Sequence, residues 1–216
     1  MGASGSKGQI ETCHDYVLLE ARDTFEKQGP SRYLAGMVNN TLATVPNGTL
    51  YDVVYPASPD LTQLTTLMGS TDINHFFTRN LAHCPDQKYS LLGYSQGATV
   101  VNEALQKIDS SNTTIFNAIQ SIVLIGNPYH LKDKRGNVDQ FGGNSTAPFD
   151  GILYLMGITI PDMWYRSGKV LDICHTDDPV CKGIDLSSLF DFTHLEYADD
   201  KSVQMVGGKF LIDSLT

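Results

Sequence analysis

The stretch Lys88–Ile108, KYSLLGYSQGATVVNEALQKI, decides the fold of this chain. It opens on the short apolar run Lys88–Gly93, typical of a buried strand, and continues into Gln96–Ile108, where apolar residues recur at helical spacing. The joint, Gly93-Tyr94-Ser95-Gln96-Gly97, fits the Gly-x-Ser-x-Gly pattern of a turn that presents a serine nucleophile at the end of a strand. Small neighbours allow such a serine to hold an unfavourable backbone conformation. This setting predicts a catalytic Ser95 rather than a bystander serine in a glycine-rich turn.

Short apolar runs alternate with longer amphipathic segments along the rest of the chain, as parallel strands and crossover helices do. The expected strands are Tyr16–Ala21, Leu50–Tyr55, Lys88–Gly93, Ser121–Gly126 and Lys169–Ile173. The expected helices are Ser31–Leu42, Leu61–Leu81, Gln96–Ile108 and Val203–Leu215. This order predicts an α/β fold with a doubly wound, mostly parallel sheet of five strands, flanked by helices on both faces. The segment His130–Gly168 is too long for an ordinary connection, which marks it as a candidate functional region.

Composition limits the class of protein. The chain has 216 residues, 41% of them hydrophobic, enough for one sizeable core, and we expect one domain over residues 10–216. Residues 1–9, MGASGSKGQ, lack the apolar core of a signal peptide and are expected to be a disordered or vector-derived leader. Charged residues make up 18% and the net charge is -9, so no basic surface is available for nucleic acid. The apolar stretch Gly151–Ile160 is too short to span a bilayer, and no stable membrane insertion is expected.

Cysteines and glycosylation signals indicate an extracellular protein. The four cysteines are even in number and lack the Cys-x-x-Cys pairs of zinc sites, so two disulfides are expected among Cys13, Cys84, Cys174 and Cys181. Asn-x-Ser/Thr acceptors, each in a polar, turn-like stretch, occur at Asn39, Asn47, Asn112 and Asn144. Together they predict a secreted glycoprotein, and we expect a monomer without metal or cofactor.

A serine nucleophile needs a base, and the base needs a partner that holds its tautomer. In the fold that carries the Gly-x-Ser-x-Gly turn, the acid and then the histidine follow the serine along the sequence. Of the six histidines, only His130, His175 and His194 come after Ser95. Chain order leaves all three open as the base.

Three motifs together resemble the cutinase family of fungal esterases: Gly-Tyr-Ser-Gln-Gly after a strand, the loop CHTDDPVC at 174–181, and the run HLEY at 194–197. The resemblance extends from about Cys13 to the C-terminus and implies a small single-domain α/β-hydrolase. It places the catalytic acid on Asp178 and the base on His194, so that Asp177 becomes a solvated loop carboxylate and His175 a surface residue. Such a triad hydrolyses esters through an acyl-enzyme on the serine, and activity should fall at acidic pH, where the base is protonated.

The oxyanion hole is expected from two backbone N–H groups. That of Gln96, the residue after the nucleophile, is one donor on general grounds. The resemblance places the second on Thr24, within Arg22-Asp23-Thr24, where the family carries Arg-Gly-Ser/Thr. Asp23 therefore departs from the family at a position that shapes this loop.

The resemblance also implies the pairing of the cysteines, Cys13 with Cys84 and Cys174 with Cys181. The second bridge would hold Asp178 within reach of His194. Reduction of this small loop should then impair activity before the protein unfolds.

Apolar residues near the triad in sequence are candidates for substrate binding. They are Tyr94, Leu155, Ile158, Ile160, Met163, Trp164, Leu189, Phe190 and Phe192. Such side chains would offer hydrophobic surface to an acyl chain, so we predict a secreted serine carboxylesterase for short- to medium-chain esters. The family resemblance alone implies polyester surfaces such as cutin as further substrates. The alternatives are an acetylxylan esterase, a lipase with a mobile lid, and an inactive binding protein on the same scaffold.

Overall fold

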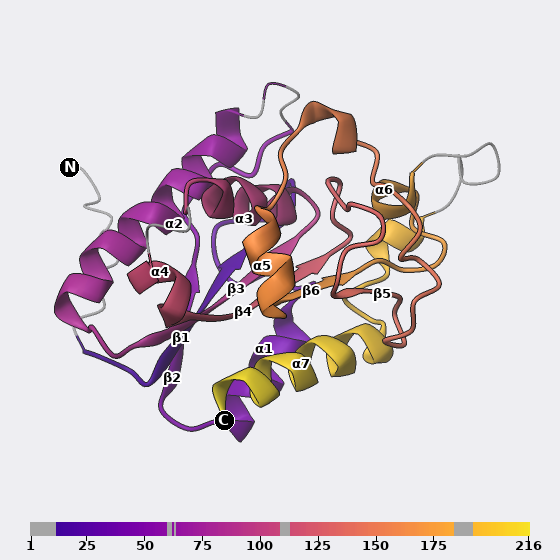
Figure 1. Cartoon of the computed structure of the whole chain (residues 1–216). Coiled ribbons are helices and arrows are strands. Elements are labelled where there is room, and N and C mark those ends of the chain that lie inside the picture. The colour runs from indigo at the N-terminus through magenta and orange to yellow at the C-terminus, as the bar shows by residue number, and fades with distance from the viewer. Residues whose placement is uncertain (1–11, 60–61, 63, 109–112, 184–191) are drawn as a thin grey trace.

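The computed structural model describes residues 12–59, 62, 64–108, 113–183 and 192–216 (Figure 1). The expected leader, residues 1–9, lies outside these ranges. The described strands form one parallel sheet in the order β2-β1-β3-β4-β6-β5. Their bounds are β1 Tyr16–Ala21, β2 Gly48–Asp52, β3 Lys88–Tyr94, β4 Ile119–Ile125, β5 Asn137–Val138 and β6 Val170–Ile173.

The sheet has six strands rather than the five expected. All of the predicted strands are present, although β2 begins and ends before the predicted Leu50–Tyr55. The additional strand, β5, pairs with β6 at the edge of the sheet. Its two residues, Asn137 and Val138, are too few to show the alternation or the apolar run by which a strand is recognised in a sequence.

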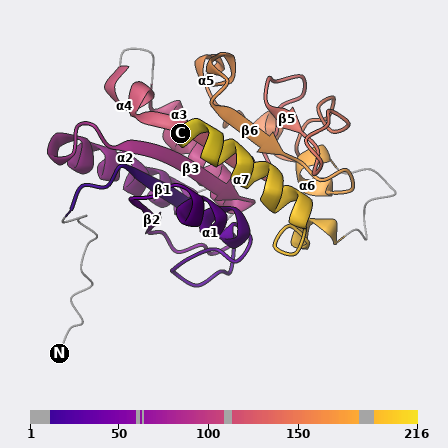
Figure 2. The ribbon, with the colours of Figure 1, turned by 90° about the horizontal axis from the view of Figure 1, so that it is seen from below.

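Helices cover both faces of the sheet. On one face α1 (Ala35–Thr44) and α7 (Lys201–Leu215) lie side by side, as Figure 2 shows from below. On the other face α2 (Leu64–His83) packs against α3 (Gln96–Gln106). These four helices fall where the hydrophobic periodicity predicts them, within a few residues at their ends. The shorter segments are α4 (Thr113–Ala118), α5 (Asp162–Ser167) and α6 (Pro179–Lys182), with the 3-10 turns η1 (Tyr154–Met156) and η2 (Thr193–Leu195).

Strand β1 buries side chains on both faces of the sheet. Val17 and Leu19 belong to the core beneath α2 and α3, whereas Tyr16 and Leu18 belong to the core beneath α1 and α7. Successive side chains of a strand point to opposite faces, so one continuous apolar run fills both cores. Burying each large apolar side chain contributes roughly 1.5–3 kcal/mol, and this packing holds the ends of the central strands in place.

The chain changes its winding direction at β1, whose neighbours in the sheet are β2 on one side and β3 on the other. Ala21, the last residue of β1, lies opposite Gly93 of β3. The segments that follow, residues 22–26 and 95–97, therefore emerge next to each other from the carboxyl ends of adjacent strands. Such a switch point is where open α/β sheets bind their ligands.

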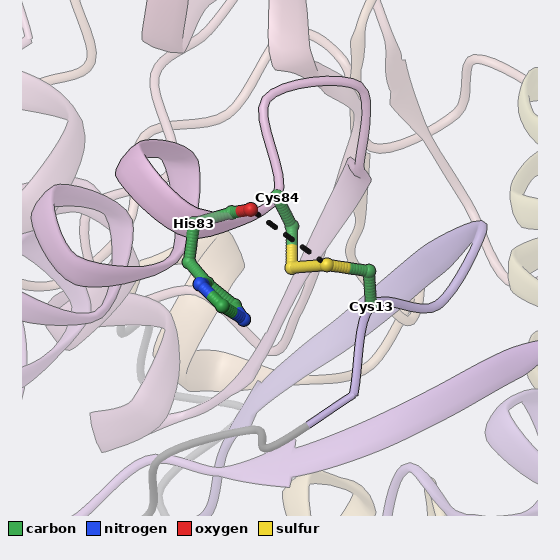
Figure 3. Close-up of side chains that lie close together, drawn as sticks. All are labelled: Cys13, His83 and Cys84. Carbon is green, nitrogen blue, oxygen red and sulfur yellow. Dashed lines mark hydrogen bonds between the residues drawn. A yellow bond between two sulfur atoms is a disulfide. The ribbon is translucent and has the colours of Figure 1, made fainter.

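Two disulfides join the described cysteines in the pairing that the family resemblance implies. Cys13–Cys84 spans 71 residues and Cys174–Cys181 spans 7. Figure 3 shows the first bridge beside His83, at the end of α2. Cys13, His83 and Cys84 are close enough together to suggest a metal site, but both sulfur atoms belong to the bridge and offer no thiolate to a cation.

One side chain of α7 joins three parts of the fold. The amide nitrogen of Gln204 donates to the carbonyl oxygens of Tyr33 and Tyr197, both at 2.8 Å. Its Oε1 accepts the backbone N–H of Met37, also at 2.8 Å. Gln204 therefore ties the beginning of α1 to the segment that follows η2.

The predicted glycosylation sites differ in their local structure. Asn39, Asn47 and Asn144 have exposed side chains, while Asn112 lies outside the described residues. Asn39 lies within α1, so the expectation of a turn is wrong for this residue. None of the helices in the described part of the chain is long and apolar enough to cross a membrane.

Candidate active site

Ser95 lies in a sharp turn between β3 and α3. Its φ of 53° and ψ of -115° are strained for a residue with a side chain. A Cβ on Gly93 would come within 2.5 Å of the carbonyl oxygen of Gly97, and one on Gly97 within 1.9 Å of the carbonyl oxygen of Ala21. Only glycine fits at both positions. The turn therefore has the geometry that the Gly-x-Ser-x-Gly pattern predicts, with the serine raised at the carboxyl end of a strand.

His194 faces Ser95 from η2. The His194 Nε2 is 2.8 Å from the Ser95 Oγ. On the other side of the ring, Nδ1 lies 3.0 Å and 2.9 Å from Oδ1 and Oδ2 of Asp178. When Nδ1 carries the proton and donates to the carboxylate, Nε2 is free to accept the serine hydroxyl, as a general base must.

Two neighbours position the imidazole ring of His194. The Tyr94 hydroxyl donates to the His194 carbonyl oxygen, and the two rings stack with their centroids 5.3 Å apart. Gly126 has a φ of 56°, and a Cβ at this position would lie 2.8 Å from the His194 Cε1. Tyr94, an expected substrate-binding residue, is fully buried and contacts His194 from within the core.

Asp178 is fully buried, and each of its carboxylate oxygens has a partner besides His194. It is the N-cap of α6, and its Oδ1 accepts the backbone N–H of Val180 at 2.8 Å. Its Oδ2 accepts the Tyr197 hydroxyl at 2.7 Å. The Sγ of Cys181, which is bridged to Cys174, lies 3.2 Å from the same oxygen. These contacts hold the carboxylate in one orientation toward the imidazole.

The other candidates for base and acid lie elsewhere. The His130 Nδ1 is 3.0 Å from the Asp172 Oδ1, and both side chains are completely buried. The His175 Nε2 is 3.6 Å from the Asp200 Oδ2. Asp177 is exposed, as expected for a solvated loop carboxylate. Of the histidines that chain order leaves open, only His194 contacts Ser95.

The two expected oxyanion donors, the N–H groups of Thr24 and Gln96, lie beside Ser95 in the same cleft. The Asp23 carboxylate lies there as well, and its Oδ1 accepts the N–H of Gln96 at 3.4 Å. Burial raises the pKa of Asp23 above its usual value, although the nearby Ser95, Thr24, His194 and Gln96 act in the opposite direction.

The cleft has a volume of about 470 Å³ and opens directly above Ser95 and His194. Its apolar lining consists of Phe25, Pro59, Pro128, Ile152, Leu153, Val180 and Leu195. Phe25 is 81% exposed and Leu195 is 50% exposed, so apolar side chains form part of the rim. An open apolar rim around a serine nucleophile suits the binding of an acyl chain.

Within the described part of the chain, none of the expected substrate-binding residues is among those that line this cleft. Ile160 and Trp164 are buried in the core beneath α2 and α3, where the Trp164 ring lies 4.7 Å from that of Phe116. Met163 packs against the same core. The apolar residues of this segment therefore fill the interior, because the apolar face of α5 packs against the core.

The remaining members of the expected set lie on the surface or outside the described residues. Leu155 is 82% exposed and Phe192 is 72% exposed, and Ile158 is partly exposed, all away from the lining of the cleft. Leu189 and Phe190 lie outside the described residues.

Several residues of the site went unrecognised in the sequence. Tyr197 belongs to the motif shared with the family, and its spacing from His194 was the available signal for a supporting role. Gly126 follows an apolar strand, and a glycine there indicates that another group packs closely against its backbone. The sequence does not show that this group is the ring of His194. The apolar rim carries no sequence signal, because Phe25 and Leu195 are single apolar residues in polar loops.

A family model described as Cutinase matches residues 12–215 of the chain. The carboxylesterase Culp1 of Mycobacterium tuberculosis is 27% identical over 183 residues, which are 84% of this chain and 75% of that protein. The cutinase cut1 of Trichoderma harzianum is 27% identical over 198 residues, covering 90% of this chain and 66% of that protein.

Solved structures agree with the sequence relatives. A cutinase-like protein from Cryptococcus sp. is 34% identical with a TM-score of 0.84, covering 95% of this chain and 97% of that one. The catalytic core domain of acetyl xylan esterase from Trichoderma reesei is 21% identical with a TM-score of 0.72, covering 94% of this chain and 100% of that one. At that identity the second likeness concerns the fold alone.

Proposed function

Because this chain belongs to the cutinase family and is a serine ester hydrolase, we propose that Ser95, His194 and Asp178 are its catalytic triad. The observation that carries the proposal is the continuous path from the Ser95 Oγ to the His194 Nε2, at 2.8 Å, and from Nδ1 to the buried Asp178. A serine hydroxyl is a weak nucleophile unless a base removes its proton, and this path supplies that base in the required tautomer.

The reaction proceeds through an acyl-enzyme. Ser95 attacks the ester carbonyl while His194 takes its proton, and Asp178 stabilises the imidazolium that forms. The N–H groups of Gln96 and Thr24 stabilise the tetrahedral oxyanion, and each such donor contributes about a hundred- to a thousandfold in rate. The alcohol leaves with the proton from His194, after which water repeats the sequence on the acyl group.

The substrates are esters of short- to medium-chain acids, and polyester surfaces such as cutin. The support is the open apolar rim, in which the highly exposed Phe25 and Leu195 can contact an acyl chain or a flat polymer. An acetylxylan esterase is the second candidate, since such an enzyme shares the fold. An acetyl group would leave most of the apolar rim unused, so the rim favours longer acyl chains.

The protein acts outside the cell as a monomer. Two disulfides, with a sequence separation of 71 residues in one and 7 in the other, are typical of proteins in an oxidising environment.

The test is hydrolysis of p-nitrophenyl esters from acetate to palmitate, with a polyester film as a further substrate. Ser95→Ala should abolish turnover of all of them, while Ser202→Ala, on helix α7 and outside the lining of the cleft, should leave it unchanged. A preference for butyrate to octanoate supports the proposal, and activity confined to acetate favours the acetylxylan esterase. Turnover that survives in Ser95→Ala would exclude the proposed nucleophile.

A further inference from the structure

The Asp23 carboxylate lies among the groups that would bind the oxyanion of an ester. Its Oδ1 accepts the N–H of Gln96 at 3.4 Å. Asp23, Thr24, Ser95 and Gln96 all line the same cleft. The N–H of Gln96 is one of the two proposed oxyanion donors, so in the free enzyme a carboxylate oxygen already contacts a group that the carbonyl oxygen of the substrate must reach.

An ionised carboxylate at this place opposes the reaction in two ways. It occupies the Gln96 N–H, a donor that the ester carbonyl needs, and its negative charge repels the charge that develops on the substrate oxygen. A protonated carboxyl behaves differently, because it is neutral and its O–H can donate a hydrogen bond to an oxyanion. Neutral aspartic acids in apolar sites are known to act in this way in enzymes.

We propose that Asp23 controls the oxyanion hole: as a carboxylate it fills the hole, and as a neutral acid it admits the ester carbonyl and donates to the oxyanion. The proposal rests on the proposed function of Ser95 and His194. Asp23 keeps its proton throughout the reaction, since the proton of the Ser95 hydroxyl passes to His194 and then to the leaving alcohol. No co-reactant other than water is required.

The surroundings of Asp23 favour the neutral form. Burial raises its pKa. On its own loop, the carboxylate of Glu26 accepts the Asp23 N–H at 2.8 Å, which places a second negative charge beside it. The neighbouring Arg22 donates instead to the carbonyl oxygens of Glu26, Val53 and Tyr55. The other ionisable groups that interact with the charge of Asp23 are Tyr33, Tyr55 and Tyr94, together with His194 across the cleft. His194 alone among these four lowers the pKa of Asp23, against the effect of burial.

Two ionisations then limit the pH range over which the enzyme is active. The active enzyme carries neutral Asp23 and neutral His194, a pair that together holds one titratable proton. The rate therefore falls at low pH when the pair gains a second proton and at higher pH when it loses the one it holds. A serine esterase with an uncharged oxyanion hole has only the first of these limits. The alkaline limb is therefore the signature of Asp23.

The experiment measures kcat/KM for p-nitrophenyl butyrate from pH 4 to 9.5 in the wild type, Asp23→Asn, Asp23→Gly and the control Asp177→Asn. The control removes one exposed carboxylate near the triad without touching the hole. We expect a bell-shaped profile for the wild type and the control. Both Asp23 variants should lose the alkaline limb, so that their rate relative to the wild type rises about tenfold for each pH unit above the ionisation of Asp23.

A second measurement, the affinity of the wild type for an inhibitor, tests the proposal even if the variants fold poorly. A trifluoromethyl ketone forms a tetrahedral adduct with Ser95 and places an oxyanion in the hole, so its affinity for the wild type should fall along the same alkaline limb. An affinity that stays constant there, or Asp23 variants with the wild-type pH profile, would overturn the proposal. Activity that survives in Ser95→Ala would instead refute the proposed function, so the two failures are distinguishable.

Discussion

Tyr197 donates a hydrogen bond of 2.7 Å to Oδ2 of Asp178, the same oxygen that lies 2.9 Å from Nδ1 of His194. The Tyr197 hydroxyl also accepts the N–H of His175 at 2.9 Å. The tyrosine is fully buried, and burial raises its pKa well above the usual value, so it remains a neutral donor at any pH at which the enzyme works.

Tyr197→Phe should lower kcat about tenfold and leave KM nearly unchanged, because the carboxylate loses the donor that orients it toward His194. The unfolding free energy should fall by about 1.5–3 kcal/mol, the usual effect of removing a hydrogen bond to a charged group. Steady-state kinetics and urea unfolding measure the two effects. Tyr154→Phe, on the surface, is the control. An unchanged kcat in a folded Tyr197→Phe would show that the tyrosine only fills space.

Gly126→Ala should lower kcat by more than its loss of stability explains. Its Cβ would lie 2.8 Å from the His194 Cε1 and would push the ring away from Ser95. The positive φ itself costs roughly 1–2 kcal/mol for a residue with a side chain. Gly157→Ala separates the two effects, because Gly157 has a φ of 79° with no atom within 4 Å of the added Cβ. Similar turnover in both variants would contradict the proposed contact with the base.

The two disulfides should separate stability from activity. Loop entropy predicts a loss of about 4.5 kcal/mol for Cys13→Ala/Cys84→Ala and about 2.5 kcal/mol for Cys174→Ala/Cys181→Ala. Only the second pair should lose turnover while still folded, because Cys181 contacts Asp178. Thermal unfolding and ester hydrolysis below both melting temperatures test this. Equal turnover in the two double variants would mean that the small loop does not position the acid.

Phe25→Ala should weaken the binding of medium acyl chains selectively. Each methylene group removed from water contributes about 0.8 kcal/mol, so the KM for p-nitrophenyl octanoate should rise severalfold while that for acetate stays the same. Phe141→Ala is the matched control, because Phe141 is also highly exposed, at 73%, and lies outside the lining of the cleft. A uniform change across all chain lengths would assign Phe25 a structural role instead.

Glu20→Gln should change how stability depends on pH. Glu20 lies opposite Asp52 on the neighbouring strand, and burial together with the charge of Asp52 raises the pKa of Glu20 from 4.5 to about 8. Between these values the folded state holds a proton that the unfolded state has lost, so the unfolding free energy falls as pH rises from about 4.5 to about 8.

Urea unfolding at several pH values should show this fall in the wild type and a much smaller one in Glu20→Gln. The exposed Glu196 provides the control variant, Glu196→Gln. If the unfolding free energy declined with pH equally in the wild type and in Glu20→Gln, the group with the raised pKa would not be Glu20.

The elements that the sequence predicted well are those with a long periodic signal. β1 coincides with the predicted Tyr16–Ala21, because a strand buried on both faces is apolar over most of its length, here at every position except Glu20. The turn at Ser95 was recognisable because its glycines are demanded by contacts with nearby backbone. The two-residue β5 carries no such pattern and was missed.

The substrate-binding residues were the weakest part of the sequence prediction, for a physical reason. The sequence does not distinguish an apolar side chain that faces the core, such as Trp164, from one that faces a cleft. The orientation of α5 determines which of the two Trp164 faces. The sequence also marked Asp23 as a departure from the family. It could not show that the side chain turns toward the N–H of Gln96, because this depends on a contact between the loop after β1 and the turn after β3.

The contacts of Gln204 mean that the site is complete only after the C-terminal part of the chain has been synthesised. Ser95 and its turn belong to the first half of the sequence, whereas His194 and the amide that holds Tyr197 lie within its last 23 residues. A ribosome delivers the chain from its N-terminus. With His194 as the proposed base, we expect the nascent protein to carry an unactivated serine until α7 has emerged and docked beside α1, so that ester hydrolysis begins only after this late segment has folded.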